Sequence, residues 1–143
     1  MRNMGAIEGN APVSDNLWET ITRRGDLAIA RWILRQMAGR SCTVVLIGRQ
    51  TTGRKWINFE IEQSWKSGKG LVGIYIHRLK NRLGSPSAKG SNPFATFRVG
   101  QVPLSRIARA YDPPFLTSTA VYGYINVNLK RWIDEAIRIR RQY

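Results

Sequence analysis

The chain has 143 residues, 43% of them hydrophobic, which predicts one folded domain over residues 1–143 rather than a disordered segment. No apolar run approaches the roughly 20 residues of a membrane span, and the amino end lacks the apolar core of a secretory signal, so we expect a cytoplasmic protein without a membrane partner. The formal net charge of +14 attracts polyanions, but the basic residues are dispersed without an arginine-rich tract or zinc knuckle, so nucleic-acid binding rests on charge alone.

The single cysteine, Cys42, lies inside an apolar segment. One cysteine excludes an internal disulfide and a cysteine-based zinc site. His77 is the only histidine, and nothing near Cys42 in the sequence would generate a thiolate. We therefore expect Cys42 to be a core residue, and we expect no metal site.

The amino-terminal part begins with a turn-rich stretch over residues 1–22. A helix follows, for which Asp26 is a candidate cap and Gly39 a stop. Its apolar residues recur at helical spacing, and they are Leu27, Ala30, Ile33, Leu34 and Met37.

The central part carries the strongest strand patterns. A strand over 42–47 is apolar throughout, as expected for a strand covered on both faces. A polar loop over 48–53 leads into a helix from about 54 to 66. A second apolar strand covers 71–76 and has His77 at its carboxyl end.

The carboxyl-terminal part is less regular between residues 84 and 123, with a weakly indicated strand over 96–99. The last helix is predicted to begin around 126–128, with an apolar stripe at Leu129, Trp132, Ile133, Ala136 and Ile137. Core or interface positions are predicted for a group of aromatic residues, namely Trp65, Tyr111, Tyr122, Tyr124 and Trp132. Alternating helices and strands favour a parallel α/β sheet, which needs more than the two strands that the pattern reveals.

Glu60 is the carboxylate that the helical pattern singles out. The inward arc of the helix over 54–66 is defined by Ile57, Ile61, Ser64 and Trp65. Glu60 lies at the edge of that arc beside Trp56, so we expect it to be partly desolvated and to titrate near physiological pH. The alternative is a glutamate of the first or second helical turn that is favoured by the helix dipole, or an ion pair with Lys55 or Arg54.

Further candidates lie where open α/β sheets bind ligands, beyond the carboxyl ends of strands. His77 holds such a position, although a lone histidine there is more often structural. The loop over 48–53 could offer backbone N–H groups to a phosphate. Arg49 and Arg54 could pair with a diphosphate or remain solvated. Trp56 could stack on a base or ribose, with a core position as the alternative.

Several segments together resemble a known family, the TIR-like domain of bacterial Thoeris anti-phage defence systems. The segments that carry the resemblance are 41–48, 51–61, 68–80, Arg23 to Ile29, Asn92 to Phe94 and Tyr122 to Ile133. The resemblance covers nearly the whole chain and implies a flavodoxin-like α/β fold. Enzymes of the wider TIR superfamily cleave NAD at the nicotinamide–ribose bond with a helix glutamate, which corresponds to Glu60.

The resemblance implies a specific activity and site. Thoeris members release a cyclic ADP-ribose isomer that activates a partner effector, so NAD is a substrate and no cofactor is implied. Trp56, Arg49, Thr51, Arg54 and His77 become the expected substrate-binding residues. TIR enzymes work as assemblies, which implies a homo-oligomer.

The chain departs from the family pattern at two places. Ile57 stands where the usual TIR helix has a cysteine after the tryptophan. Family members also carry a first strand and helix before the equivalent of residues 2–4, so we expect an amino-terminally shortened domain. This departure favours an alternative function, that of a catalytically silent TIR-like module for protein–protein interaction. A basic nucleic-acid-binding protein is the third interpretation.

Overall fold

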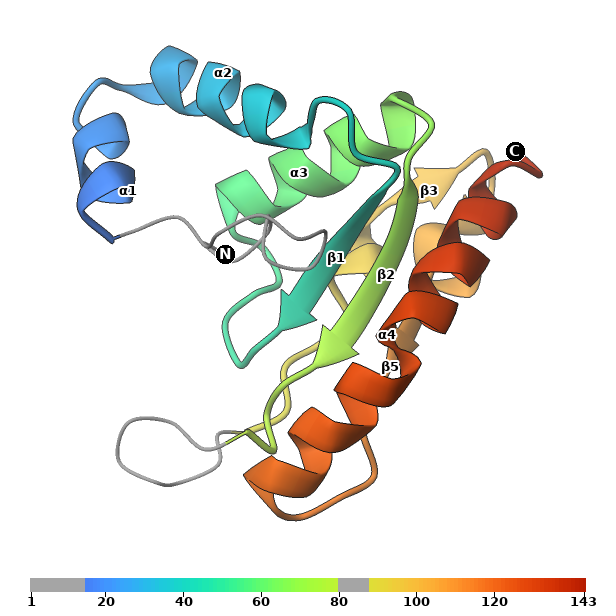
Figure 1. Ribbon diagram of the computed structural model, residues 1–143. Helices are drawn as coiled ribbons and strands as arrows, with labels where there is room; N and C mark the ends of the chain where they lie inside the picture. Colours follow the sequence, from blue (N-terminus) through green and yellow to red (C-terminus); the bar gives the residue numbers. More distant parts are fainter. Residues whose placement is uncertain (1–14, 80–87) are drawn as a thin grey trace.

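The structure is a computed structural model that describes residues 15–79 and 88–143 (Figure 1). In chain order its helices, strands and 3₁₀ helices (η) are α1 (Asp15–Thr22), α2 (Asp26–Met37), β1 (Cys42–Ile47), α3 (Lys55–Lys66), β2 (Gly70–Tyr75), η1 (Pro93–Thr96), β3 (Arg98–Val99), β4 (Val102–Pro103), η2 (Leu104–Arg106), β5 (Arg109–Tyr111) and α4 (Ser118–Arg140).

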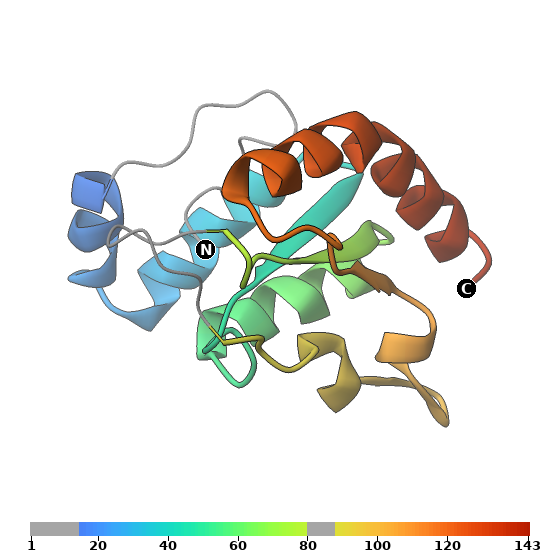
Figure 2. The same ribbon diagram turned by 90° about the horizontal axis from the view of Figure 1, so that it is seen from below.

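A parallel sheet of three strands, in the order β1-β2-β5, forms the centre of the fold. β1 pairs with β2 along its whole length, from Cys42 opposite Gly70 to Ile47 opposite Tyr75. Seen along the sheet, α4 covers one face and α3 covers the other (Figure 2). The prediction of an α/β fold with a parallel sheet flanked by helices is therefore confirmed.

The side chains of β1 alternate between two apolar clusters, because successive residues of a strand point to opposite faces. Val45 and Ile47 belong to the cluster that includes residues of α3. Cys42 and Val44 belong to the cluster around Trp132 of α4. Both faces of β1 are buried, as its uninterrupted apolar run predicts, and Cys42 is confirmed as a core residue.

The strand predicted over 71–76 begins and ends one residue earlier, as β2. Its first residue, Gly70, lies against the backbone of α4. A Cβ at that position would come within 2.7 Å of the carbonyl carbon of Ala136. The glycine thus permits the close approach of α4 to the sheet.

The third strand of the sheet, β5, was not predicted. It has three residues and none of them is fully buried, so it lacks both the length and the apolar run that mark a strand. The weakly indicated strand over 96–99 corresponds in its second half to β3, which pairs antiparallel with β4. Its first residue, Thr96, instead ends the 3₁₀ helix η1.

Three predictions about the amino-terminal helices need correction. The turn-rich stretch predicted over 1–22 lies outside the described residues up to residue 14, and residues 15–22 form α1. Asp26 does not cap α2, because the cap is Gly25 in a positive-φ conformation without a side-chain hydrogen bond. Leu27 and Leu34 are exposed, and the buried stripe consists of Ile29, Trp32, Ile33 and Met37.

Helix α4 begins at Ser118, well before the predicted start around 126–128. The side chain of Thr117 caps it by accepting a hydrogen bond from the backbone N–H of Ala120. Val121 in its first turn is fully buried, so tertiary packing outweighs the modest helix propensity of this segment.

The apolar stripe of α4 lies against the sheet as predicted. Trp132 is 1% exposed and stacks on Tyr111 with ring centroids 4.3 Å apart, and Tyr124 packs at its edge. Tyr122 is 64% exposed, so it is not a core residue, and its alternative position at an interface stays a prediction. No helix in residues 15–79 and 88–143 combines the length and apolarity that crossing a bilayer requires.

Candidate active site

Glu60 lies in the middle of α3 and is almost completely buried, with 4% of its surface exposed. Its Oε2 atom is shielded from solvent and has no hydrogen-bond partner among the described residues. The helical pattern predicted a position at the edge of the inward arc, and the structure places the carboxyl group deeper than that. A buried carboxyl without a partner is costly to ionise.

Burial changes the acidity of this group strongly. Desolvation raises the pKa of Glu60 from 4.5 to about 7, as the sequence pattern predicted in direction. The group therefore changes charge near neutral pH, which is the range that acid–base and electrostatic catalysis require.

The alternative in which Glu60 pairs with Lys55 or Arg54 is wrong. Lys55 pairs with Asp26, and Arg54 donates to the backbone carbonyl and side-chain oxygens of Gln50. The outward acidic residue is Glu62, half-exposed and paired with Lys66 at 2.7 Å.

The helix presents Glu60 inward because its neighbours anchor that face. Ile57 and Ile61 pack in the cluster between α3 and the sheet. One turn after Glu60, the hydroxyl of Ser64 lies 2.7 Å from that of Thr43 on β1, and both residues are buried. This hydrogen bond and the apolar contacts determine the rotation of α3 about its axis.

A cavity of about 310 Å³ lies at the carboxyl end of β1. It is lined by Leu46, Gly48, Arg49, Gln50, Thr51, Arg54, Ile57 and Ile76. Three predicted substrate-binding residues, Arg49, Thr51 and Arg54, are thus brought together at the sheet edge where ligands are expected.

The loop that forms this cavity is held by its own hydrogen bonds. The Thr51 hydroxyl accepts from the Gly48 N–H at 2.8 Å and donates to the Leu46 carbonyl at 3.3 Å. The Thr52 hydroxyl donates to the Ser91 carbonyl at 2.8 Å, which ties the loop to the segment before η1. Arg54, the N-cap of α3, makes no side-chain cap hydrogen bond within the described residues, and the first N–H groups of a helix are the donors that can bind an anion.

Glu60 itself does not line this cavity. Ile57 does, and Glu60 follows it by about one helical turn on the same side of α3. Glu60 therefore shares α3 and the loop before it with Arg49, Thr51 and Arg54.

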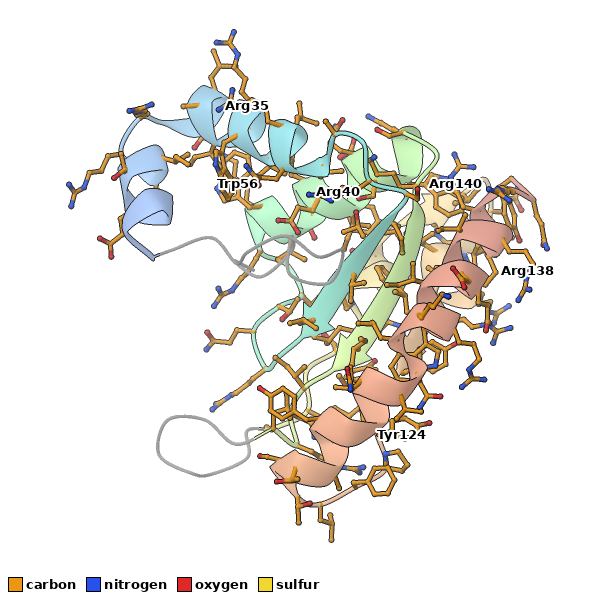
Figure 3. All side chains as sticks on the ribbon, in the orientation of Figure 1. Arg35, Arg40, Trp56, Tyr124, Arg138 and Arg140 are labelled. Atoms are coloured by element: carbon orange, nitrogen blue, oxygen red, sulfur yellow. The ribbon has the colours of Figure 1, made fainter. Side chains whose placement is uncertain are left out.

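Trp56 is directed away from this cavity. It packs against the α2 cluster and meets Phe59 edge-to-face, with ring centroids 5.6 Å apart. Figure 3 shows it between α2 and α3. The core interpretation of Trp56 accounts for this position.

His77 lies beyond the carboxyl end of β2, as predicted, and takes part in a separate polar cluster. Its Nε2 is 2.9 Å from a carboxyl oxygen of Asp112, whose other oxygen is 3.1 Å from the Lys89 ammonium. The ammonium also lies over the Tyr75 ring, 4.5 Å from its centroid. The sequence analysis missed Asp112 and Lys89; the position of Asp112 directly after β5 would have indicated it, had that short strand been recognised.

No group of three or more His, Cys, Asp or Glu side chains that could hold a metal ion occurs within the described part of the chain.

Comparison with known proteins identifies a family and a relative that this chain resembles. The family described as "Thoeris protein ThsB, TIR-like domain" matches residues 1–81. A protein of Bacillus cereus (strain MSX-D12), named "Putative cyclic ADP-D-ribose synthase ThsB1", is 39% identical over 79 residues. That alignment covers 55% of this chain and 41% of the relative, so the chain matches about two fifths of the relative's length.

Proposed function

The chain belongs to the family of Thoeris ThsB TIR-like domains, and on that premise we propose that it cleaves NAD and forms a cyclic ADP-ribose-type signal in anti-phage defence. The observation that carries the proposal is Glu60, a buried helix carboxyl group whose pKa is raised to about 7. The name of the Bacillus cereus relative supports the same reaction class.

Cleavage of the nicotinamide–ribose bond leaves its electron pair on nicotinamide, which departs as a neutral base and needs no strong general acid. Positive charge then builds on the ribose, in an oxocarbenium-like transition state. The ionised carboxylate of Glu60 stabilises that charge and orients the attacking group. Attack from the adenosine half of the same molecule closes a ring, whereas attack by water gives linear ADP-ribose.

The cavity at the carboxyl end of β1 is the proposed place for the diphosphate. Arg49 and Arg54 supply guanidinium groups, and the uncapped start of α3 supplies N–H donors. Glu60 lies six residues after Arg54, which is about 9 Å along the helix axis. Substrate access to the carboxyl group then requires movement in the surrounding structure, because Glu60 is 4% exposed and does not line the cavity.

NAD is the substrate in this scheme, and no cofactor takes part. Two partners belong to the same proposal: further copies of the chain in a homo-oligomer, and an effector protein that responds to the cyclic product.

The test is Glu60→Gln, which keeps the size of the side chain and removes its charge. NAD consumption and products are followed by chromatography for the wild-type chain, Glu60→Gln and Glu62→Gln. We expect Glu60→Gln to lower the rate about a hundredfold or more, and Glu62→Gln, an exposed glutamate on the same helix, to keep it. Wild-type turnover in the Glu60→Gln variant would exclude the catalytic role.

A catalytically silent interaction module is the second candidate. It is favoured by the finding that the cavity beside α3 is lined by Ile57 and not by Glu60. The NAD assay separates the two candidates, because a silent module consumes no NAD even as the wild-type chain. Light scattering should still show that such a module self-associates.

A further inference from the structure

A second cavity, of about 200 Å³, lies between α1 and α2. Its apolar wall is formed by Ile21, Ala28 and Trp32, and arginines line the rest. These arginines are Arg24, Arg31 and Arg35, and all three are exposed. The cavity shares no lining residue with the one at the carboxyl end of β1.

The positive charge around this cavity is not balanced by the described residues. None of its three arginines forms an ion pair with a side chain in residues 15–79 or 88–143. Asp26, the acidic residue of α2, pairs with Lys55 of α3 instead. Arg31 and Arg35 are four residues apart on one helix, a spacing at which like charges repel and destabilise the helix. An anion in the cavity would remove this repulsion.

The residue type points to a particular kind of anion. All basic residues between positions 19 and 40 are arginines, whereas α3 carries lysines at its first and last positions. A guanidinium group offers a planar fork of donors that matches phosphate oxygens, whereas a lysine ammonium acts as a point charge.

We propose that the cavity between α1 and α2 binds a phosphate group of a small phosphorylated ligand. Its concave form and apolar wall suit one compact anionic group. A nucleic-acid backbone would need a basic groove that follows several successive phosphates. The inference is independent of Glu60, which lies on α3 and lines neither cavity.

The experiment is a titration of the full chain with inorganic pyrophosphate, followed by nuclear magnetic resonance at the Ala28 amide and the Trp32 indole N–H. These probes report on this cavity and not on the one at β1. We expect saturable shifts below about 10 mM pyrophosphate. Arg31→Gln/Arg35→Gln should weaken the affinity about tenfold or more, and the lysine double variant should recover only part of the loss.

The matched control removes the same charge from a distant helix. Figure 3 shows Arg35 on α2 and Arg138 on α4 at opposite sides of the molecule. Arg138→Gln/Arg141→Gln should change the affinity less than about threefold, because it alters only the long-range potential. The glutamine variants are at exposed positions, and unchanged thermal unfolding would verify their folding.

Three results would overturn the proposal. One is an absence of shifts at Ala28 and Trp32 at the highest pyrophosphate concentration. Another is an equal loss of affinity in the α2 and α4 double variants. The last is that the chain binds a single-stranded oligonucleotide but no pyrophosphate, and that both double variants weaken oligonucleotide binding equally. Because Glu60→Gln should leave pyrophosphate binding intact, these outcomes are distinguishable from failure of the NAD reaction.

Discussion

Replacing Glu60 by glutamine should stabilise the protein at high pH, even though it abolishes the proposed activity. Burial raises the pKa of Glu60 from 4.5 to about 7, which at about 1.4 kcal/mol per pKa unit corresponds to about 3 kcal/mol. Below pH 4.5 the carboxyl group is protonated in both the folded and the unfolded chain, so its burial does not lower the free energy of unfolding. As pH rises towards 7 the unfolded chain loses this proton first, so the free energy of unfolding falls.

The measurement is urea unfolding at pH 5 and pH 9, followed by tryptophan fluorescence. We expect Glu60→Gln to have a higher free energy of unfolding than the wild type. The difference should be small at pH 5 and rise to about 3 kcal/mol at pH 9. Glu62→Gln is the matched control, because its exposed ion pair with Lys66 is worth only about 0.3–0.5 kcal/mol. A difference between Glu60→Gln and wild type that is the same at both pH values would refute the desolvation argument.

Three further substitutions test packing and polar contacts elsewhere in the fold. Thr43→Val should cost about 1–3 kcal/mol in unfolding free energy by leaving the Ser64 hydroxyl buried without its partner; adding Ser64→Ala should recover part of this loss in a double-mutant cycle. Gly70→Ala should lower the melting temperature, with a cost of about 1–3 kcal/mol, because the new methyl group would meet the backbone of α4. Although burial raises the pKa of Asp112, its hydrogen bond with His77 lowers it, and the net pKa is below the ordinary value. Asp112→Asn should therefore reduce the melting temperature at pH 7, and its difference from wild type should shrink as the pH falls through the lowered pKa.

The elements with a strong, local pattern were predicted well. The apolar run of β1 and the helical spacing in α3 predicted both elements and the inward side of the helix. Glu60 follows from that spacing, since a residue three positions after Ile57 must share its side of the helix. The raised pKa of Glu60 follows in direction from the same pattern.

The elements that depend on distant partners were not predicted. β5 is a strand only because its backbone pairs with β2. The first turn of α4 depends on the Thr117 cap and on the burial of Val121. Asp112 reaches His77 only because β5 lies parallel to β2.

The amino-acid sequence by itself determined the family, the α/β class and the residues of the β1–α3 unit, because short-range periodicity and local motifs carry that information. Only the tertiary structure decided how deeply the carboxyl group of Glu60 is buried and which side chains share a cavity. Both depend on how α2, α3 and the sheet pack together, and desolvation depends on every neighbour that excludes water from the group. For the same reason Arg24, Arg31 and Arg35 were only dispersed charges in the sequence, and the fold gathers these three residues around one cavity.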